Sequence, residues 1–288
     1  MSRILVIGAT GRVGREVVRE LLAAGLSVRA LTRRPEAAGL PASVEIVSGD
    51  LTMPESLDAG LQGVSAVFLV WTAAPATASA VVARLAEQAR RVVLLSSPHQ
   101  TPHPFFQQPN PMAAFHAELE RLMADAGLES TILRPGMFAS NTRLWWAPQI
   151  RQGDVVRWPY GSVETAPIDE RDIAAVAMRV LTDDRHIGRD YVLTGPQAIS
   201  QAGQVSAIGA VLGREIRFVE LSPDEFRQEM AGRAPAAAVD MLLNAWQAAS
   251  GHPAFLTSTV ADIVGRPALT FQQWAVDHAD DFGALSAA

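Results

Sequence analysis

The chain has 288 residues, of which 49% are hydrophobic and 19% are charged. It contains no cysteine, which excludes disulfides, thiolate nucleophiles and iron–sulfur clusters. All 24 basic residues are arginine, so a lysine Schiff base is excluded as well. With 30 acidic residues the net charge is −6 and the arginines are scattered, so we expect no nucleic-acid partner.

Two segments bear on membranes and targeting. Arg3 precedes an apolar run of only four residues, which is too short for a secretory signal. Residues 63–83 carry no charge, but Pro75 interrupts them, and they divide into a buried strand and a small-residue helix. We therefore expect a cytoplasmic protein without a membrane partner.

Short apolar runs alternate with helical stretches through the first half of the chain. In chain order, the pattern predicts a strand at 4–7, a helix at 12–24, strands at 27–31 and 44–47, a helix at 55–61, a strand at 66–71, a helix at 77–88, a strand at 92–95, a helix at 112–126 and a strand at 131–133. Most of these strands are apolar throughout, which is typical of parallel sheets covered by helices on both faces. The sequence thus predicts an α/β fold, a Rossmann-type doubly wound parallel sheet over residues 1–135.

Beyond residue 135 the alternation ends. Tryptophans gather there, helices dominate, and short strands are expected only near 191–193 and 216–219. We expect residues 136–288 to form a smaller, mostly helical substrate-binding part whose strands return to the core, with no clean linker.

A glycine-rich loop joins the first strand to the first helix. Gly8 permits a tight turn, Gly11 lets backbone N–H groups approach a pyrophosphate, and Gly14 allows close helix–strand packing. The start of the helix then offers unpaired N–H groups and a positive dipole end to the phosphates. The loop predicts a dinucleotide site that also includes the intervening residues Thr10, Arg12 and Val13.

The end of the second strand predicts which dinucleotide is bound. An NAD site usually carries an acidic residue there, whereas this chain has Arg33 and Arg34. Guanidinium groups match the oxygens of a 2′-phosphate, so NADP(H) is the expected cofactor and NAD(H) the alternative. The competing interpretation is that both arginines are solvated on a surface turn.

Further polar positions follow the other predicted strands. Asp50 and Leu51 come after the third strand, where the carboxylate could accept a hydrogen bond from adenine or simply stabilise a turn. Trp71 and Thr72 follow the fourth strand, and Ser96 follows the fifth. Since these strands end at one edge of the sheet, all five positions are expected beside the cofactor.

The sequence resembles the NmrA-like branch of atypical short-chain dehydrogenases, which includes NADP(H)-sensing regulators, quinone oxidoreductases and triphenylmethane dye reductases. The resemblance covers nearly the whole chain. It depends on GATGRVG at 8–14, GDL at 49–51, HAELERLMADAGLESTILRPGMFASN at 116–141, PIDERDIAAVAMRVL at 167–181, YVLTGP at 191–196 and TVADIVGRPALTFQQWAVDHADDF at 259–282.

Most short-chain dehydrogenases use a Tyr-x-x-x-Lys pair on the helix before the sixth strand. The corresponding positions here hold Met112 and His116, so neither catalytic residue is present. Reduction of a simple ketone needs a proton donor, whereas reduction of a quinone or dye gives a stabilised product. We therefore expect an NADP(H)-dependent oxidoreductase acting on a quinone-like or other aromatic small molecule. The alternative is an NADP(H)-sensing regulatory protein that binds a protein partner without turnover.

Several aromatic and polar residues are candidates for the substrate site. His116, Ser97 and Tyr160 are the candidate proton donors, although a helical histidine more often packs or caps. An aromatic wall is expected from Phe138, Trp145, Trp146 and Trp158, unless these side chains are core residues.

No metal site is expected. The acidic residues Asp169, Glu170 and Asp172 stand just before an alanine-rich stretch, where carboxylates favour the helix dipole and its cap.

Overall fold

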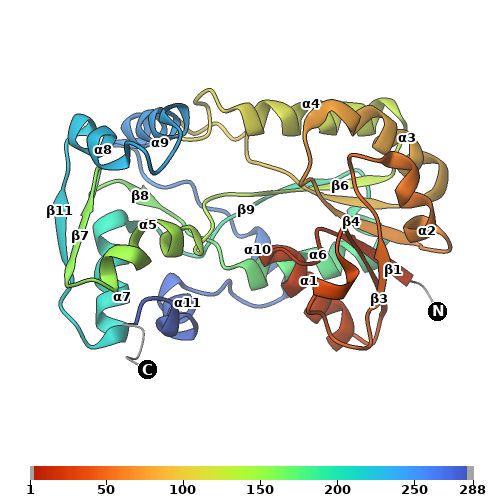
Figure 1. Cartoon of the computed structure of the whole chain (residues 1–288), viewed down its shortest axis with the longest axis horizontal. Coiled ribbons are helices and arrows are strands. Elements are labelled where there is room, and N and C mark those ends of the chain that lie inside the picture. The colour runs from red at the N-terminus through yellow and green to blue at the C-terminus, as the bar shows by residue number, and fades with distance from the viewer. Residues whose placement is uncertain (1–2, 284–288) are drawn as a thin grey trace.

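The computed structural model describes residues 3–283, and its centre is a seven-stranded sheet (Figure 1). The strand order is β3-β2-β1-β4-β5-β6-β9, and every pairing is parallel. The strands are β1 (Arg3–Ile7), β2 (Ser27–Thr32), β3 (Glu45–Ser48), β4 (Ala66–Val70), β5 (Val92–Leu95), β6 (Ser130–Pro135) and β9 (Asp190–Leu193). This order reverses direction between β1 and β4, the switch point at which doubly wound sheets bind nucleotides.

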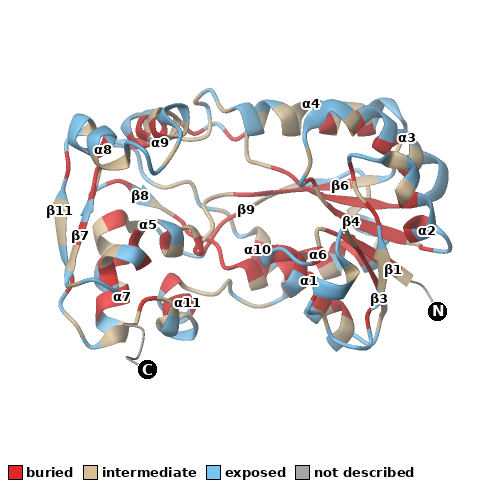
Figure 2. Ribbon diagram, in the orientation of Figure 1, coloured by how far each residue is buried: buried red, intermediate tan, exposed pale blue. Residues whose placement is uncertain are grey.

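Helices cover both faces of the sheet. On one face, α1 (Arg12–Ala23) and α6 (Glu170–Thr182) pack on residues such as Ile4 and Val6. On the other face, α3 (Ala78–Gln88) and α4 (Pro111–Asp125) pack with the short α2 (Asp58–Leu61) near Leu5 and Ile7. Alternate residues of β1 thus enter two different cores, which explains why the strand is apolar and buried from Ile4 to Ile7 (Figure 2).

The rest of the chain forms a third core beyond the carboxyl edge of the sheet (Figure 1). It is centred on buried aromatic residues that include Trp146, Trp246 and Trp274. Its elements are α5 (Asn141–Ile150), β7 (Val155–Trp158), β8 (Glu164–Thr165), β10 (Ile199–Ser200), α7 (Gln201–Leu212), β11 (Arg217–Glu220), α8 (Pro223–Met230), α9 (Ala236–Ala249) and α11 (Phe271–Asp277). From this part, α10 (Thr259–Val264) returns to pack on α6, with Val260 in the sheet-side core.

The predicted fold class is confirmed, and the predicted elements of the first half lie within a few residues of the observed ones. The segment 55–61 differs most, because it begins as a 3-10 helix at Pro54–Leu57 before α2. The strand expected near 191–193 is β9, which adds to the sheet beside β6. Within residues 3–283, no helix combines the length and apolar character that crossing a bilayer requires.

Candidate cofactor and substrate site

The glycine loop between β1 and α1 is packed too closely for side chains. Gly8 has a φ of +85°, and a Cβ there would lie 2.8 Å from the Cβ of Val70. A Cβ on Gly14 would lie 2.1 Å from the carbonyl oxygen of Gly8. The backbone N–H of Gly11 donates to that same oxygen at 3.0 Å and closes the turn. The loop therefore presents bare backbone to whatever binds in front of it.

The N-terminus of α1 is open toward this loop. Gly11 is its N-cap and supplies no side-chain acceptor, and the first turn contains no acidic residue. The first N–H groups of the helix, together with its positive dipole end, are thus available to an anion. Nothing in the first turn competes with a phosphate for this position.

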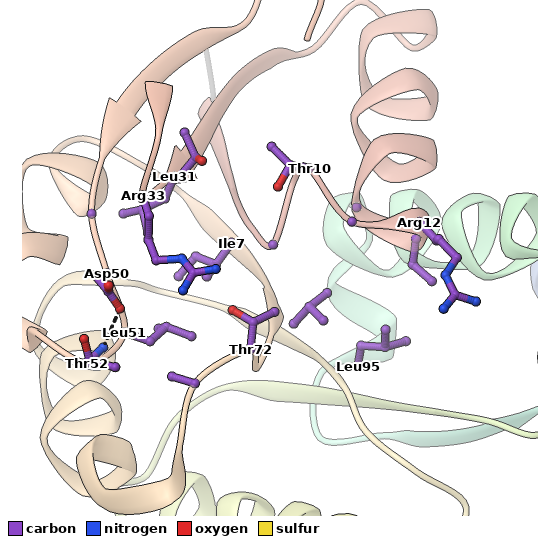
Figure 3. Close-up of a pocket in the computed structure, with 18 of the residues that line it drawn as sticks. Ile7, Thr10, Arg12, Leu31, Arg33, Asp50, Leu51, Thr52, Thr72 and Leu95 are labelled. Atoms are coloured by element: carbon purple, nitrogen blue, oxygen red, sulfur yellow. Dashed lines mark hydrogen bonds between the residues drawn. The ribbon is translucent and has the colours of Figure 1, made fainter. Parts of the chain in front are cut away.

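A cavity of about 480 Å³ lies in front of the loop and follows the carboxyl edge of the sheet (Figure 3). It is bounded by the loop itself, by the ends of β2, β3, β4 and β5, and by the segment after β6. The lining residues predicted from the sequence are Gly8, Thr10, Gly11, Arg12, Val13, Gly14, Arg33, Asp50, Leu51, Thr72 and Phe138. The cavity extends from the second strand to the segment after the sixth, as an extended dinucleotide requires.

Arg33 and Asp50 lie together at one end of this cavity (Figure 3). The backbone N–H of Thr52 donates to the Asp50 carboxylate at 2.9 Å, and this bond lowers the pKa of Asp50. The Arg33 charge lowers that pKa further. The guanidinium of Arg33 is exposed to the cavity, whereas Arg34 is exposed elsewhere and does not line it.

Two other predicted cofactor residues also lie outside the lining of this cavity. The indole N–H of Trp71 donates to the carbonyl of Ala73 at 2.7 Å, and its ring packs on Phe115. The hydroxyl of Ser96 donates to Glu120 at 2.5 Å. Both side chains are buried and stabilise the strand ends on which the cavity is built.

A second cavity, of about 180 Å³, adjoins the first at the ends of β5 and β6. Leu95 and Phe138 line the larger cavity, while Ser97 and Met137 line the smaller one. Because these pairs are two residues apart or adjacent in the chain, the two cavities lie close together at the ends of these strands. The other walls come from the loop before α4, from the first turn of α4 and from α9, with Pro98, His99, Phe105, Phe106, Gln108, Pro109, Asn110, Ala113, Met241, Leu242 and Ala245.

A buried polar network lies next to the second cavity. Arg134 donates to the Glu120 carboxylate at 2.6 Å, and Ser96 donates to its other oxygen. The Nε2 atom of His99 lies 3.7 Å from this carboxylate, too far for a hydrogen bond. The hydroxyl of Ser97 is buried and has no partner among the described residues. Ser97 is therefore the predicted proton donor that the structure places beside this cavity with its hydrogen-bonding capacity unused.

The other two predicted donors lie elsewhere. His116 is half-buried on α4, one turn before Glu120, and burial lowers its pKa, while Glu120 acts in the opposite direction. Tyr160 follows β7 with a φ of +57° and packs against the third core. Neither side chain lines the two cavities described above.

The predicted aromatic wall is largely a core. Trp146 and Trp158 are almost completely buried, and the indole N–H of Trp158 donates to Gln201. Trp145 stacks on Trp158 and meets Trp246 edge to face. These rings fill the third core because large aromatic surfaces are stabilised by burial against one another. Of the four predicted wall residues, Phe138 alone lines the larger cavity, and the other three line neither cavity.

Apart from Ser97, the residues that surround the second cavity were not predicted from the sequence. Phe105 and Phe106 are adjacent in a proline-rich loop, and this aromatic pair was a usable signal. Met137 and Leu242 carried no such signal in the sequence, because they meet at this cavity only through the packing of α9 against the loop and the end of β6.

Two of the acidic residues at the start of α6 have different roles. Asp169 caps the helix by accepting from the Arg171 N–H, as predicted. Asp172 is fully buried and accepts from Arg266 and from the Leu269 N–H. Within the described chain, no cluster of three or more histidine, aspartate or glutamate side chains could hold a metal ion.

Known proteins share this chain's fold and much of its sequence. A reductase of (4-alkanoyl-5-oxo-2,5-dihydrofuran-3-yl)methyl phosphate from Streptomyces griseus is 40% identical, covering 97% of this chain and 99% of its own length. An NAD(P)H azoreductase from Xenophilus azovorans is 34% identical, with coverage of 98% and 99%. The crystal structure of an NADPH-dependent quinone oxidoreductase from Escherichia coli superimposes with a TM-score of 0.80 at 25% identity, covering 95% of this chain and 98% of that chain.

The family model described as NAD(P)H-binding matches residues 8–184, which begin at the first glycine of the loop. This range contains both the glycine loop and five of the seven strands of the sheet, all except β1 and β9. The resemblance to the NmrA-like branch is confirmed by these matches. The chain belongs to the NAD(P)H-binding family of NmrA-like atypical short-chain dehydrogenases, among relatives that are reductases.

Proposed function

We propose that this protein is an NADPH-dependent reductase that transfers hydride to an uncharged, quinone-like or other conjugated small molecule. The observation that carries the proposal is the small apolar cavity beside the strand ends that border the cofactor cavity. A nicotinamide cofactor would supply the hydride, and the chain would orient the acceptor against it.

The preference for NADPH over NADH is supported by Arg33. Its guanidinium faces the end of the cavity where the adenosine ribose of a dinucleotide falls in this fold. A 2′-phosphate there would gain a charge-assisted contact that a 2′-hydroxyl would not.

The nature of the acceptor is supported by the lining of the second cavity. Phe105, Phe106, Met137 and Leu242 contribute apolar surface, and His99 is the one ionisable side chain among its lining residues. An apolar lining of this kind favours a flat, uncharged molecule, because the burial of an unpaired charge costs on the order of several kcal/mol. The Streptomyces relative is named for a phosphate-bearing substrate, and no arginine lines this cavity to pair with such a phosphate.

The relatives' names share one chemical feature that fits a site without a Tyr-Lys pair. A quinone, an azo compound and an oxo-dihydrofuran are all conjugated, electron-poor acceptors. Hydride addition to such a molecule gives a delocalised anion, so a dedicated catalytic acid contributes less than it does with a simple ketone. Ser97 lines the second cavity and its hydroxyl has no partner among the described residues, which supports a role as hydrogen-bond donor to that anion.

Turnover tests this proposal. We expect NADPH oxidation, followed by absorbance, with a panel of quinones, azo dyes and conjugated lactones. Leu242→Trp, which fills the second cavity, should raise the acceptor KM at least about tenfold and leave the NADPH Kd within about twofold. Asn244→Trp, on the exposed side of α9, is the matched control and should change neither constant.

Failure would be plain in the same assay. A protein that binds NADPH but reduces no member of the panel would contradict the proposal and favour a cofactor-sensing protein. Equal effects of Leu242→Trp and Asn244→Trp would contradict the assignment of the second cavity.

A further inference from the structure

Arg12 is connected to the interior of the fold by a chain of hydrogen bonds. It is the first residue of α1 and lines the cofactor cavity. Its Nη1 donates to the hydroxyl of Ser140 at 2.7 Å, and that hydroxyl donates to Oε1 of Glu170. Ser140 is 2% exposed and Glu170 is 6% exposed, so the chain of bonds leads from a buried carboxylate to the side chain of Arg12, a residue that lines the cavity.

The buried carboxylate has no other evident role. The N-cap of α6 is the neighbouring Asp169, so Glu170 is not needed to cap the helix. Asp172, two residues further along, makes the contacts with Arg266 and Leu269 that tie the C-terminal segment to α6. Burial raises the pKa of Glu170 above its usual value, and the Ser140 hydrogen bond and the Arg12 charge offset only part of that rise. A buried acid is costly unless it is paired, and here its pairing leads to Arg12.

The two arginines of the cavity lie on opposite sides of the glycine loop. Figure 3 shows Arg33 beside Asp50, whereas Arg12 lies on the far side of Thr10, near Leu95 at the end of β5. In this fold the adenosine half of a dinucleotide lies toward β2 and β3, and the nicotinamide half lies toward β5. Arg12 and Arg33 are thus placed to meet different parts of one ligand.

We propose that Ser140 and Glu170 are positioning residues that hold the Arg12 guanidinium against the nicotinamide half of NADPH, at the distal phosphate of its pyrophosphate. This inference rests on the proposed binding of NADPH in the larger cavity. Glu170 supplies the charge, Ser140 transmits it through one hydroxyl, and Arg12 keeps its remaining N–H groups free for phosphate oxygens.

The test compares two ligands in equilibrium titrations at fixed ionic strength. NADPH contains both halves of the cofactor, whereas 2′,5′-ADP carries the adenosine, the 2′-phosphate and the proximal phosphate alone. Glu170→Gln should raise the Kd of NADPH about tenfold, the effect of one charge-assisted hydrogen bond, and leave that of 2′,5′-ADP within about twofold. Ser140→Ala should act in the same way, so the test does not depend on one variant being folded.

Two controls distinguish positioning from a general effect on the fold. Glu16→Gln removes an acid on the same side of α1 that pairs with Arg19, and it should leave both ligands unaffected. In an Arg12→Ala background, Glu170→Gln should cause no further loss of NADPH affinity, since its effect passes through that arginine.

Equal losses for NADPH and 2′,5′-ADP, or full additivity with Arg12→Ala, would overturn the inference and assign Glu170 to the stability of the fold alone. The proposed reductase activity is judged separately: a wild-type protein that binds NADPH and turns over no acceptor leaves the positioning result intact. A wild-type protein that binds neither ligand would overturn both.

Discussion

Two adjacent arginines follow β2, and one of them, Arg33, lines the cofactor cavity while Arg34 lies outside it. We expect Arg33→Ala to raise the Kd of NADPH roughly 10- to 100-fold, because it removes charge-assisted hydrogen bonds to the 2′-phosphate. The Kd of NADH, which lacks this phosphate, should change by less than about threefold. Isothermal calorimetry with both coenzymes measures the difference.

Arg34→Ala is the matched control, since it removes the same charge from the neighbouring position. It should leave both coenzymes bound as in the wild type. If Arg34→Ala raised the Kd of NADPH as much as Arg33→Ala, the general positive charge of the turn would explain the preference for NADPH. The specific contact assigned to Arg33 would then be wrong.

The contact between β1 and α1 depends on the absence of a side chain at Gly14. A Cβ there would lie 2.1 Å from the Gly8 carbonyl oxygen, so the helix must move away from the loop. Gly14→Ala should lower the free energy of unfolding by about 1–3 kcal/mol. It should also raise the Kd of NADPH above the wild-type value. Chemical denaturation and titration measure the two effects.

The control for this substitution is Gly153→Ala, where an added Cβ meets nothing within 4 Å. It should be neutral or slightly stabilising, because alanine restricts the unfolded chain. A Gly14→Ala protein that is as stable as Gly153→Ala and binds NADPH normally would contradict the packing argument.

The elements of the sheet were predictable from the sequence, whereas the second cavity was not. Most of the strands are marked by a short apolar run, since both faces of the sheet are covered, and the spacing of the glycines predicts the close contacts of the loop. By contrast, Leu242 reaches the cavity through the packing of α9, a long-range arrangement that leaves no local pattern. Trp146 and Trp158 had the composition of a ligand-binding wall, yet aromatic burial in a third core explains them as well.

The two halves of the chain are interlocked at the scale of the whole molecule. The strand ends, the loop before α4 and the first turn of α4 supply part of the second cavity, and α9 supplies the rest. The chain then returns to the sheet layer, where α10 packs on α6 and the buried Asp172 holds Arg266 and the Leu269 N–H (Figure 1). The second cavity is therefore complete only when the C-terminal part is in place on the sheet.

The roles proposed for Arg12, Arg33 and the second cavity all require that NADPH binds in the cavity in front of the glycine loop. Calorimetric titration of the intact protein with NADPH tests this most directly. We predict one site per chain and, at about 100 times the Kd, a gain of roughly 2.7 kcal/mol in the free energy of unfolding. A titration that shows no binding of NADPH, together with no shift in the unfolding transition, would contradict the assignment of this cavity as the cofactor site.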